Sequence, residues 1–176
     1  MKVLGFAGFS GSGKTTLVEH LVRGLRQKGL RVSVVKHAHH QFEMDQPGKD
    51  SWRHREAGAF EVLIASNRRL VLQREYEQSA EPQVHHLLAE VYDGVDWVLV
   101  EGFKYSDLPK IEVWRPESGA VVLYPEDPFI KAIATNDPDQ VRPTTLRPVL
   151  DLDQPEQILQ WMLDNGDDLL YHPPIA

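Results

Sequence analysis

The sequence predicts an α/β fold, a mainly parallel sheet with helices on both faces and a β-hairpin extension. Three observations indicate it. A glycine-rich stretch joins an apolar run at residues 2–8 to an amphipathic segment whose apolar face comprises Leu17, Val18, Leu21, Val22 and Leu25. A second apolar run, residues 31–36, follows that segment, which makes a strand–helix–strand unit. A third, residues 97–100, is apolar throughout, as expected for a parallel strand covered on both faces.

The glycine-rich stretch, GFSGSGKT at residues 8–15, fits the phosphate-loop pattern G-x-x-x-x-G-K-[ST] at every fixed position. Its glycines permit backbone angles that let N–H groups surround phosphate oxygens, and the following helix points its positive end at the same phosphates. We expect Lys14 to reach the β- and γ-phosphates and Thr15 to bind Mg²⁺. The fold is therefore expected to be P-loop NTPase-like. The expected nucleotide contacts here are Gly8, Phe9, Ser10, Gly11, Ser12, Gly13, Lys14, Thr15 and Thr16.

Length and composition limit the function classes. The 176 residues, 41% of them hydrophobic, suit one domain, and we expect a single nucleotide-binding domain over residues 1–165 and a loose tail over 166–176. The formal charge of −7 argues against nucleic acid or an anionic membrane as a partner. The absence of cysteine excludes disulfides and thiolate metal sites. No stretch approaches 18 apolar residues, so we expect a cytoplasmic protein.

Hydrophobic periodicity and turn residues predict the remaining elements. The first helix is expected to end near Lys28, and residues 37–49 should form a loop. Asp50 or Ser51 should cap a short helix that ends at Gly58. Residues 60–65 and 70–73 should pair as a hairpin, and Pro82 should open a helix. Further strands are expected at 111–114, 120–123, 130–134 and 149–152, and a last helix at 154–163.

Acidic residues after two of the strands are candidate magnesium ligands. Glu101 ends the run at 98–100, where phosphate-loop proteins place a carboxylate that holds magnesium directly or through water. Glu101 has three alternative roles: it contacts magnesium through water, it activates the attacking water, or it is an ordinary solvated carboxylate. Asp45 lies in the loop after the second strand and is a further candidate, whereas Asp50 is better explained as a helix cap. We therefore predict Lys14 and Glu101 as catalytic residues, and Thr15, Asp45 and Glu101 around the metal.

The segment KHAHH at residues 36–40 is the most unusual polar cluster. Its three histidines allow a metal site, an anion or partner contact, or plain surface positions. We assign Lys36 and His37 to the nucleotide site. Asn136 and Asp137 follow a late strand, where they are suited to contact guanine O6 and the N1 and N2 hydrogens, although a capped turn before Pro138 explains them equally well.

Together, residues 8–16, KHAHH at 36–40, DQPGKDS at 45–51, AGA at 57–59 and LVEGFK at 99–104 resemble the MobB family, the molybdopterin-guanine dinucleotide biosynthesis adapter proteins. The resemblance extends to about residue 137. It implies a homodimeric GTP-binding protein with weak GTPase activity, which assists the guanylyltransferase MobA in attaching GMP to molybdopterin. It also implies that the phosphate loop binds GTP, that Thr15, Asp45 and Glu101 surround Mg²⁺, and that the hairpin near 60–73 is a dimer edge.

Two other function classes stay open. A small-molecule kinase uses the same loop, but it usually needs an arginine-rich lid, and Asn67, Arg68 and Arg69 form the only candidate. A nickel-insertion GTPase would use the histidines as ligands. No arginine is assigned as a finger that stabilises transition-state charge, which fits slow GTP hydrolysis. The enzyme class is thus a weak GTPase at most.

Overall fold

The computed structural model describes residues 1–38, 42–78 and 81–174. The contacts within the chain divide it into two compact units. The first unit comprises residues 1–37 and 83–176, and the second comprises residues 38–82.

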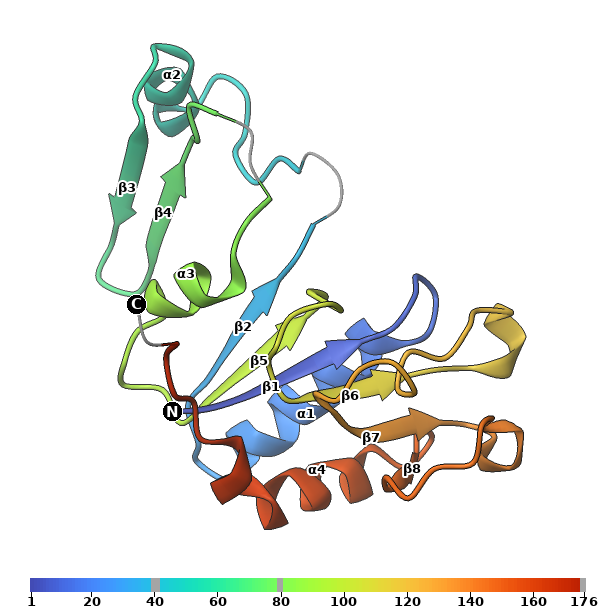
Figure 1. Cartoon of the computed structure of the whole chain (residues 1–176). Coiled ribbons are helices and arrows are strands. Elements are labelled where there is room, and N and C mark those ends of the chain that lie inside the picture. The colour runs from blue at the N-terminus through green and yellow to red at the C-terminus, as the bar shows by residue number, and fades with distance from the viewer. Residues whose placement is uncertain (39–41, 79–80, 175–176) are drawn as a thin grey trace. The chain divides into compact units, whose positions relative to one another are not determined.

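A six-stranded sheet organises the first unit, in the order β2-β5-β1-β6-β7-β8 (Figure 1). Every pair of neighbouring strands is parallel. The expectation of a mainly parallel sheet is therefore confirmed. The strands are β1 (Lys2–Ala7), β2 (Val32–Lys36), β5 (Trp97–Glu101), β6 (Lys110–Val113), β7 (Ile130–Thr135) and β8 (Val149–Asp151).

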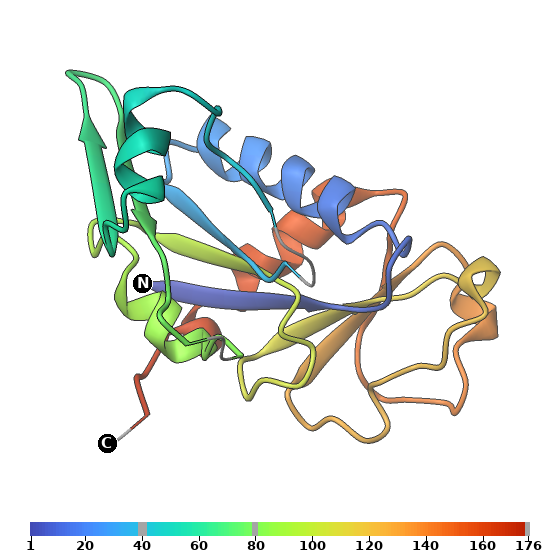
Figure 2. The same cartoon turned by 90° about the horizontal axis from the view of Figure 1, so that it is seen from above.

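Helices cover both faces of this sheet (Figure 2). α1 (Lys14–Gln27) and α4 (Pro155–Asp164) lie on one face, where Leu21 and Ile158 belong to the same buried apolar cluster. α3 (Val84–Ala89) lies on the other face, and its Leu88 packs with Val98. Leu17, Leu21 and Leu25 recur at helical spacing on α1, which is why this segment folds as a helix against the sheet. The packed layers hold the carboxyl ends of β1 and β5 in place.

Residues 120–123 do not form the strand that the sequence suggested. The carboxylate of Glu112, on β6, accepts hydrogen bonds from the backbone N–H groups of Leu123, over 2.7 Å, and Tyr124, over 2.9 Å. The Glu112 side chain thus accepts hydrogen bonds from backbone N–H groups that, in a strand, would donate to a neighbouring strand. Burial raises the pKa of this carboxyl group above its ordinary value, although both hydrogen bonds act in the opposite direction.

The segment after α4 is packed, in contrast to the loose tail that the sequence suggested. A 3₁₀ helix at Gly166–Leu169 buries Leu169, which is 2% exposed. Leu170 forms a β-bridge with Lys2. The Tyr171 hydroxyl and Asp107 Oδ1 contact the two ring nitrogens of His85, over 2.8 and 2.7 Å. The apolar side chain of Leu169 and this hydrogen-bonded group fix the chain through Tyr171. The other 3₁₀ helices are Pro116–Ser118 and Pro138–Gln140.

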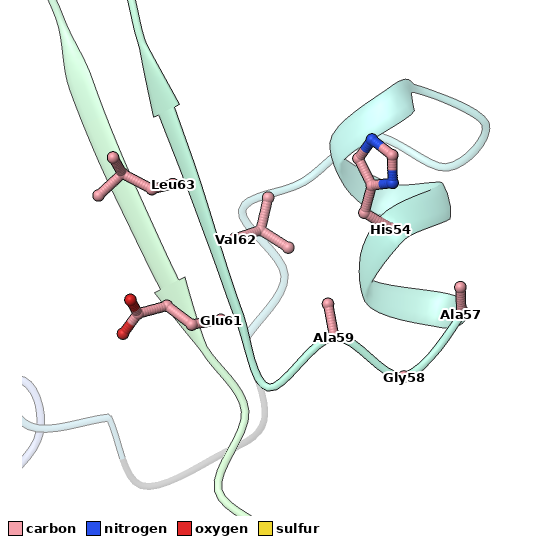
Figure 3. A pocket seen from close by; sticks show the side chains of 7 residues that line it. All are labelled: His54, Ala57, Gly58, Ala59, Glu61, Val62 and Leu63. Carbon is pink, nitrogen blue, oxygen red and sulfur yellow. The ribbon is translucent and has the colours of Figure 1, made fainter.

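The second unit contains α2 (Asp50–Glu56) and an antiparallel hairpin of β3 (Glu61–Ala65) and β4 (Leu70–Arg74). The hairpin confirms the sequence expectation. The expected cap of α2 is wrong: Lys49 is the N-cap, no side chain caps the helix, and Ser51 instead donates to Asp45 Oδ1 over 2.9 Å. A shallow hollow of about 510 Å³ lies between α2 and β3, and Figure 3 shows Val62 turned toward the helix. It is lined by His54, Ala57, Gly58, Ala59, Glu61, Val62 and Leu63.

Among the residues that the structure describes, no helix has the length and apolar character needed to span a lipid bilayer.

Candidate nucleotide-phosphate site

The glycine-rich loop turns sharply between β1 and α1. Gly8, Gly11 and Gly13 have φ angles of 145°, 80° and 96°, a region that side chains rarely allow. Helix α1 begins directly after Gly13, with no side chain capping its N-terminus. Its first backbone N–H groups therefore stay available to an anion. The Ser12 hydroxyl is buried and has no hydrogen-bond partner in the described part of the chain.

Lys14 lies inside the curve of this loop. Its ammonium group donates to the carbonyl oxygens of Gly8, over 2.9 Å, and Phe9, over 2.8 Å. An ammonium group has three N–H donors, so one stays available for a ligand. Burial is the main cause that lowers the pKa of Lys14 below its ordinary value, and the nearby Glu101 acts in the opposite direction. A half-buried cation at the loop is the group expected to meet phosphate oxygens.

Thr15 and Glu101 join the start of α1 to the end of β5. The Thr15 hydroxyl donates to Glu101 Oε1 over 2.6 Å, and Lys36 Nζ lies 3.3 Å from the same oxygen. Glu101 is 8% exposed. Glu101 is therefore not the ordinary solvated carboxylate that was one alternative. Two oxygen groups of a kind that Mg²⁺ binds meet beside the phosphate loop.

His37 supports the turn that follows β5. Its backbone N–H donates to the Glu101 carbonyl over 2.9 Å, and its ring stacks on Phe103 with 4.5 Å between centroids. A Cβ on Gly102 would stand 2.8 Å from His37 Cβ, so this position needs glycine. His39 and His40 lie outside the described residues. Within the described residues, no group of three or more His, Cys, Asp or Glu side chains is placed to hold a metal ion.

Asp45 belongs to the second unit, and its assignment to the metal stays a prediction. Its Oδ1 also accepts from the Gln46 N–H over 2.9 Å, while its Oδ2 has no hydrogen-bond partner among the described residues. Asp50 forms an ion pair of 3.8 Å with Arg53, on the same helix. Arg68 and Arg69, the lid candidates of the kinase alternative, lie between β3 and β4 in the second unit.

The candidate base-contacting residues follow β7, as the sequence suggested. Asn136 Nδ2 donates to Glu117 Oε1 over 3.0 Å, and Asn136 Oδ1 has no partner within the described residues. Asp137 Oδ2 accepts from Gln140 Nε2 over 2.6 Å. Because the Asn136 amide group has two N–H donors, its second N–H stays available for guanine O6 while the first bonds to Glu117.

Sequence reasoning gave no role to two basic residues that contact the phosphate loop. Arg115, just after β6, donates from Nε to the Ser12 carbonyl over 3.3 Å. Lys104, three residues after Glu101, places its ammonium 4.2 Å from the centroid of the Phe9 ring. Both residues follow the carboxyl ends of parallel strands, where α/β sheets bind ligands. Their position after predicted strands could therefore have identified them as candidate site residues.

The hollow in the second unit is not this site, because it is lined by none of the phosphate-loop residues. The candidate site is the phosphate loop, because its glycines and Lys14, with Glu101 beside them, are groups suited to bind phosphate and a metal ion, and none of them lines the hollow. Residues 3–136 match the family described as MobB, molybdopterin guanine dinucleotide synthesis protein B. The chain belongs to the MobB family. The resemblance noted from the sequence motifs is thereby confirmed.

Two MobB relatives carry the name molybdopterin-guanine dinucleotide biosynthesis adapter protein. The one from Haemophilus influenzae is 40% identical over 163 residues, which cover 91% of this chain and 86% of that protein. The one from Escherichia coli is 39% identical over 118 residues, which cover 66% of this chain and 67% of that protein.

Solved MobB structures have the same fold. The MobB homolog from Bacillus stearothermophilus superposes with a TM-score of 0.73 at 25% identity, over 96% of this chain and 99% of that one. Bacillus subtilis MobB superposes with a TM-score of 0.72 at 22% identity, over 94% of this chain and 98% of that one. At this identity the likeness shows the fold alone. The α/β architecture predicted from the sequence is confirmed.

Proposed function

We propose that this chain is a GTP-binding adapter with weak GTPase activity, which assists the guanylyltransferase MobA in attaching GMP to molybdopterin. The observation that carries the proposal is the 2.6 Å hydrogen bond from Thr15 to Glu101 beside a complete phosphate loop. Membership of the MobB family, whose relatives are named as adapters of this synthesis, supplies the pathway.

The phosphate groups of GTP fit the loop. Three positive-φ glycines turn the backbone, and Lys14 supplies the cation. The oxygens of Thr15 and Glu101 fit a hard cation such as Mg²⁺, which when bound would offset the negative charge of the β- and γ-phosphates. In this proposal Lys14 holds the phosphates, and Glu101 orients the attacking water. Lys36 and His37 line the edge of the same site.

Guanine selectivity is proposed for Asn136 and Asp137. The unpartnered Asn136 Oδ1 supports a polar ligand here, because a buried acceptor without a donor is costly. Competition of GTP with ATP for the chain tests this, and equal affinity for both nucleotides would remove the assignment.

A homodimer through the hairpin is also proposed. Large apolar side chains on β3 and β4 are exposed: Leu63 by 59%, Ile64 by 42% and Leu70 by 65%. A two-stranded sheet is marginal by itself, and a free strand edge readily pairs with a second copy. Light scattering should therefore give twice the chain mass, and Leu63→Lys should shift the protein toward monomer. A wild-type monomer at micromolar concentration would contradict the dimer.

Calorimetry tests the nucleotide site. We expect Lys14→Ala to weaken GTP binding in Mg²⁺ by roughly 10-fold or more, because a charge-assisted contact is lost. The fold should persist, since Lys14 bonds only to its own loop among the described residues. Lys28→Ala, at the opposite end of α1, is the matched control. Unchanged GTP affinity in Lys14→Ala would reject the site.

Reconstitution tests the adapter role. Adding the chain to MobA, molybdopterin and GTP should raise the yield of the dinucleotide, and Lys14→Ala should not. Transfer of phosphate from the nucleotide to a small-molecule acceptor would favour a kinase instead. Stoichiometric nickel binding would favour a nickel-insertion GTPase.

A further inference from the structure

Cations outnumber anions around Glu101. The carboxylate has Lys36 at 3.3 Å, and both Lys14 and Lys104 lie at the adjoining phosphate loop. Lys104 forms no ion pair with a carboxylate in the described part of the chain, although the whole chain carries a net charge of −7. One carboxylate cannot balance three neighbouring ammonium groups, so this local excess of positive charge points to an anionic ligand.

Lys14 and Lys104 approach the same loop residue. The Lys14 ammonium donates to the Phe9 carbonyl over 2.8 Å, and the Lys104 ammonium lies 4.2 Å from the centroid of the Phe9 ring. The charge of Lys104 also contributes to lowering the pKa of Lys14, after the larger effect of burial. Two mutually repelling cations therefore flank Phe9.

The backbone before Lys104 adopts an uncommon conformation. Gly102 has φ 95° and Phe103 has φ 48°, so two consecutive residues have positive φ directly after Glu101. A side chain opposes this conformation at Phe103, and such strain persists only where the surroundings enforce it. The stack of Phe103 on His37 is one such constraint.

A buried ion pair holds the other side of this turn. Lys110 is fully buried, and its ammonium pairs with Asp127 over 2.7 Å. The same ammonium donates to the carbonyl of Lys104 over 3.1 Å and to the carbonyl of Ser106. Burying an ammonium is costly unless it is paired and fully hydrogen-bonded, and here three oxygens surround it. Lys110 is therefore a positioning residue for the backbone of Lys104.

We propose that Lys104 is a nucleotide-binding residue that contacts the terminal phosphate of a bound nucleoside triphosphate, an inference that rests on the proposed function. Thr15 and Glu101 mark the end of the loop where the β- and γ-phosphates lie. Lys104 follows Glu101 by three residues and faces the same stretch of loop as Lys14. The positive charge of Lys104 attracts the negative terminal phosphoryl group. In this proposal Lys104 does not contact the base or the ribose.

The ratio of GTP to GDP affinity tests this inference. Lys104→Met keeps the apolar stem and removes the charge. We expect it to raise the Kd for GTP by roughly 10-fold or more while the Kd for GDP changes by less than about 3-fold, because only GTP carries the terminal phosphate. Lys104→Arg should stay close to wild type, since it keeps a cation. Lys28→Met, at the far end of α1, should change neither Kd.

The outcomes separate the two proposals. Wild-type chain that binds neither nucleotide would reject the proposed function itself. Wild-type chain that binds GTP, with Lys104→Met equal to wild type, would reject only the role of Lys104. An equal loss of GTP and GDP affinity would also reject it, because it would show a general disturbance of the loop. Thermal unfolding of each variant identifies any loss of fold, in which case Lys104→Gln replaces Lys104→Met.

Discussion

Gly8 lies directly against the carbonyl group of Val113. A Cβ on Gly8 would stand 2.3 Å from that oxygen, which belongs to the end of β6, the strand beside β1. The first glycine of the phosphate loop is thus needed for two reasons: it allows the positive φ angle, and it leaves room for the carbonyl group of Val113. Gly11 also has a positive φ, but a Cβ there would meet nothing within 4 Å.

Gly8→Ala should therefore be much more harmful than Gly11→Ala. Both variants carry the strain of alanine at positive φ, about 1–2 kcal/mol. Gly8→Ala also forces β6 away from the loop, and we expect it to lower the free energy of unfolding by about 3 kcal/mol or more and to abolish GTP binding. Urea denaturation and calorimetry of both variants measure this. Equal destabilisation by the two substitutions would contradict the contact with Val113.

Glu101→Gln should slow GTP hydrolysis more than it weakens GTP binding. The amide keeps the shape of the side chain but lacks the charge that orients a water or supports Mg²⁺. We expect turnover to fall by about 10-fold or more and GTP affinity by less than about 3-fold. Single-turnover phosphate release measures the rate. Glu19→Gln, an exposed substitution on α1, is the control, and an unchanged rate in Glu101→Gln would remove this residue from the mechanism.

The sequence predicted the parts of the site that follow from local rules. The phosphate loop is recognisable because glycine, lysine and threonine stand at fixed spacing, and Glu101 because it ends an apolar strand. The parallel sheet follows from the same apolar runs. The likeness of these elements to solved MobB structures confirms the fold.

The features that the sequence did not predict depend on contacts between residues that are distant in sequence. Lys110 stands just before the strand expected at 111–114, and no local pattern indicates that Asp127 neutralises it in the core. The strand expected at 120–123 is wrong because Glu112 takes the backbone donors at its end. Leu169 is buried against the other elements through tertiary packing, which composition does not indicate.

Stability should depend on the protonation of Glu112. Burial raises the pKa of this carboxyl group in the folded state above its ordinary value of 4.5. Between pH 4.5 and the folded-state pKa, the native state therefore binds more protons than the unfolded state. The stability from Glu112 is therefore complete below pH 4.5 and is lost as the pH rises through the folded-state pKa. Glu112→Gln does not titrate, and its amide leaves one backbone N–H unpaired, at a cost of about 1–3 kcal/mol. The difference in unfolding free energy between wild type and Glu112→Gln should thus shrink as the pH rises from 4 to 7. A difference that stays constant or grows would show that the pKa is not raised.

Removing residues 166–176 should destabilise the first unit. Leu169 is 2% exposed and belongs to the cluster formed by α1 and α4, and Leu170 bridges to β1. Losing the burial of one leucine and exposing its neighbours should lower the free energy of unfolding by roughly 2 kcal/mol or more. Removing only residues 173–176, beyond Tyr171 and its contact with His85, should change it by less than about 0.5 kcal/mol. Denaturant unfolding of both truncated chains measures the difference. If the longer deletion were as stable as the shorter one, the segment through Tyr171 would not be part of the folded core, and the bridge to Lys2 would contribute nothing.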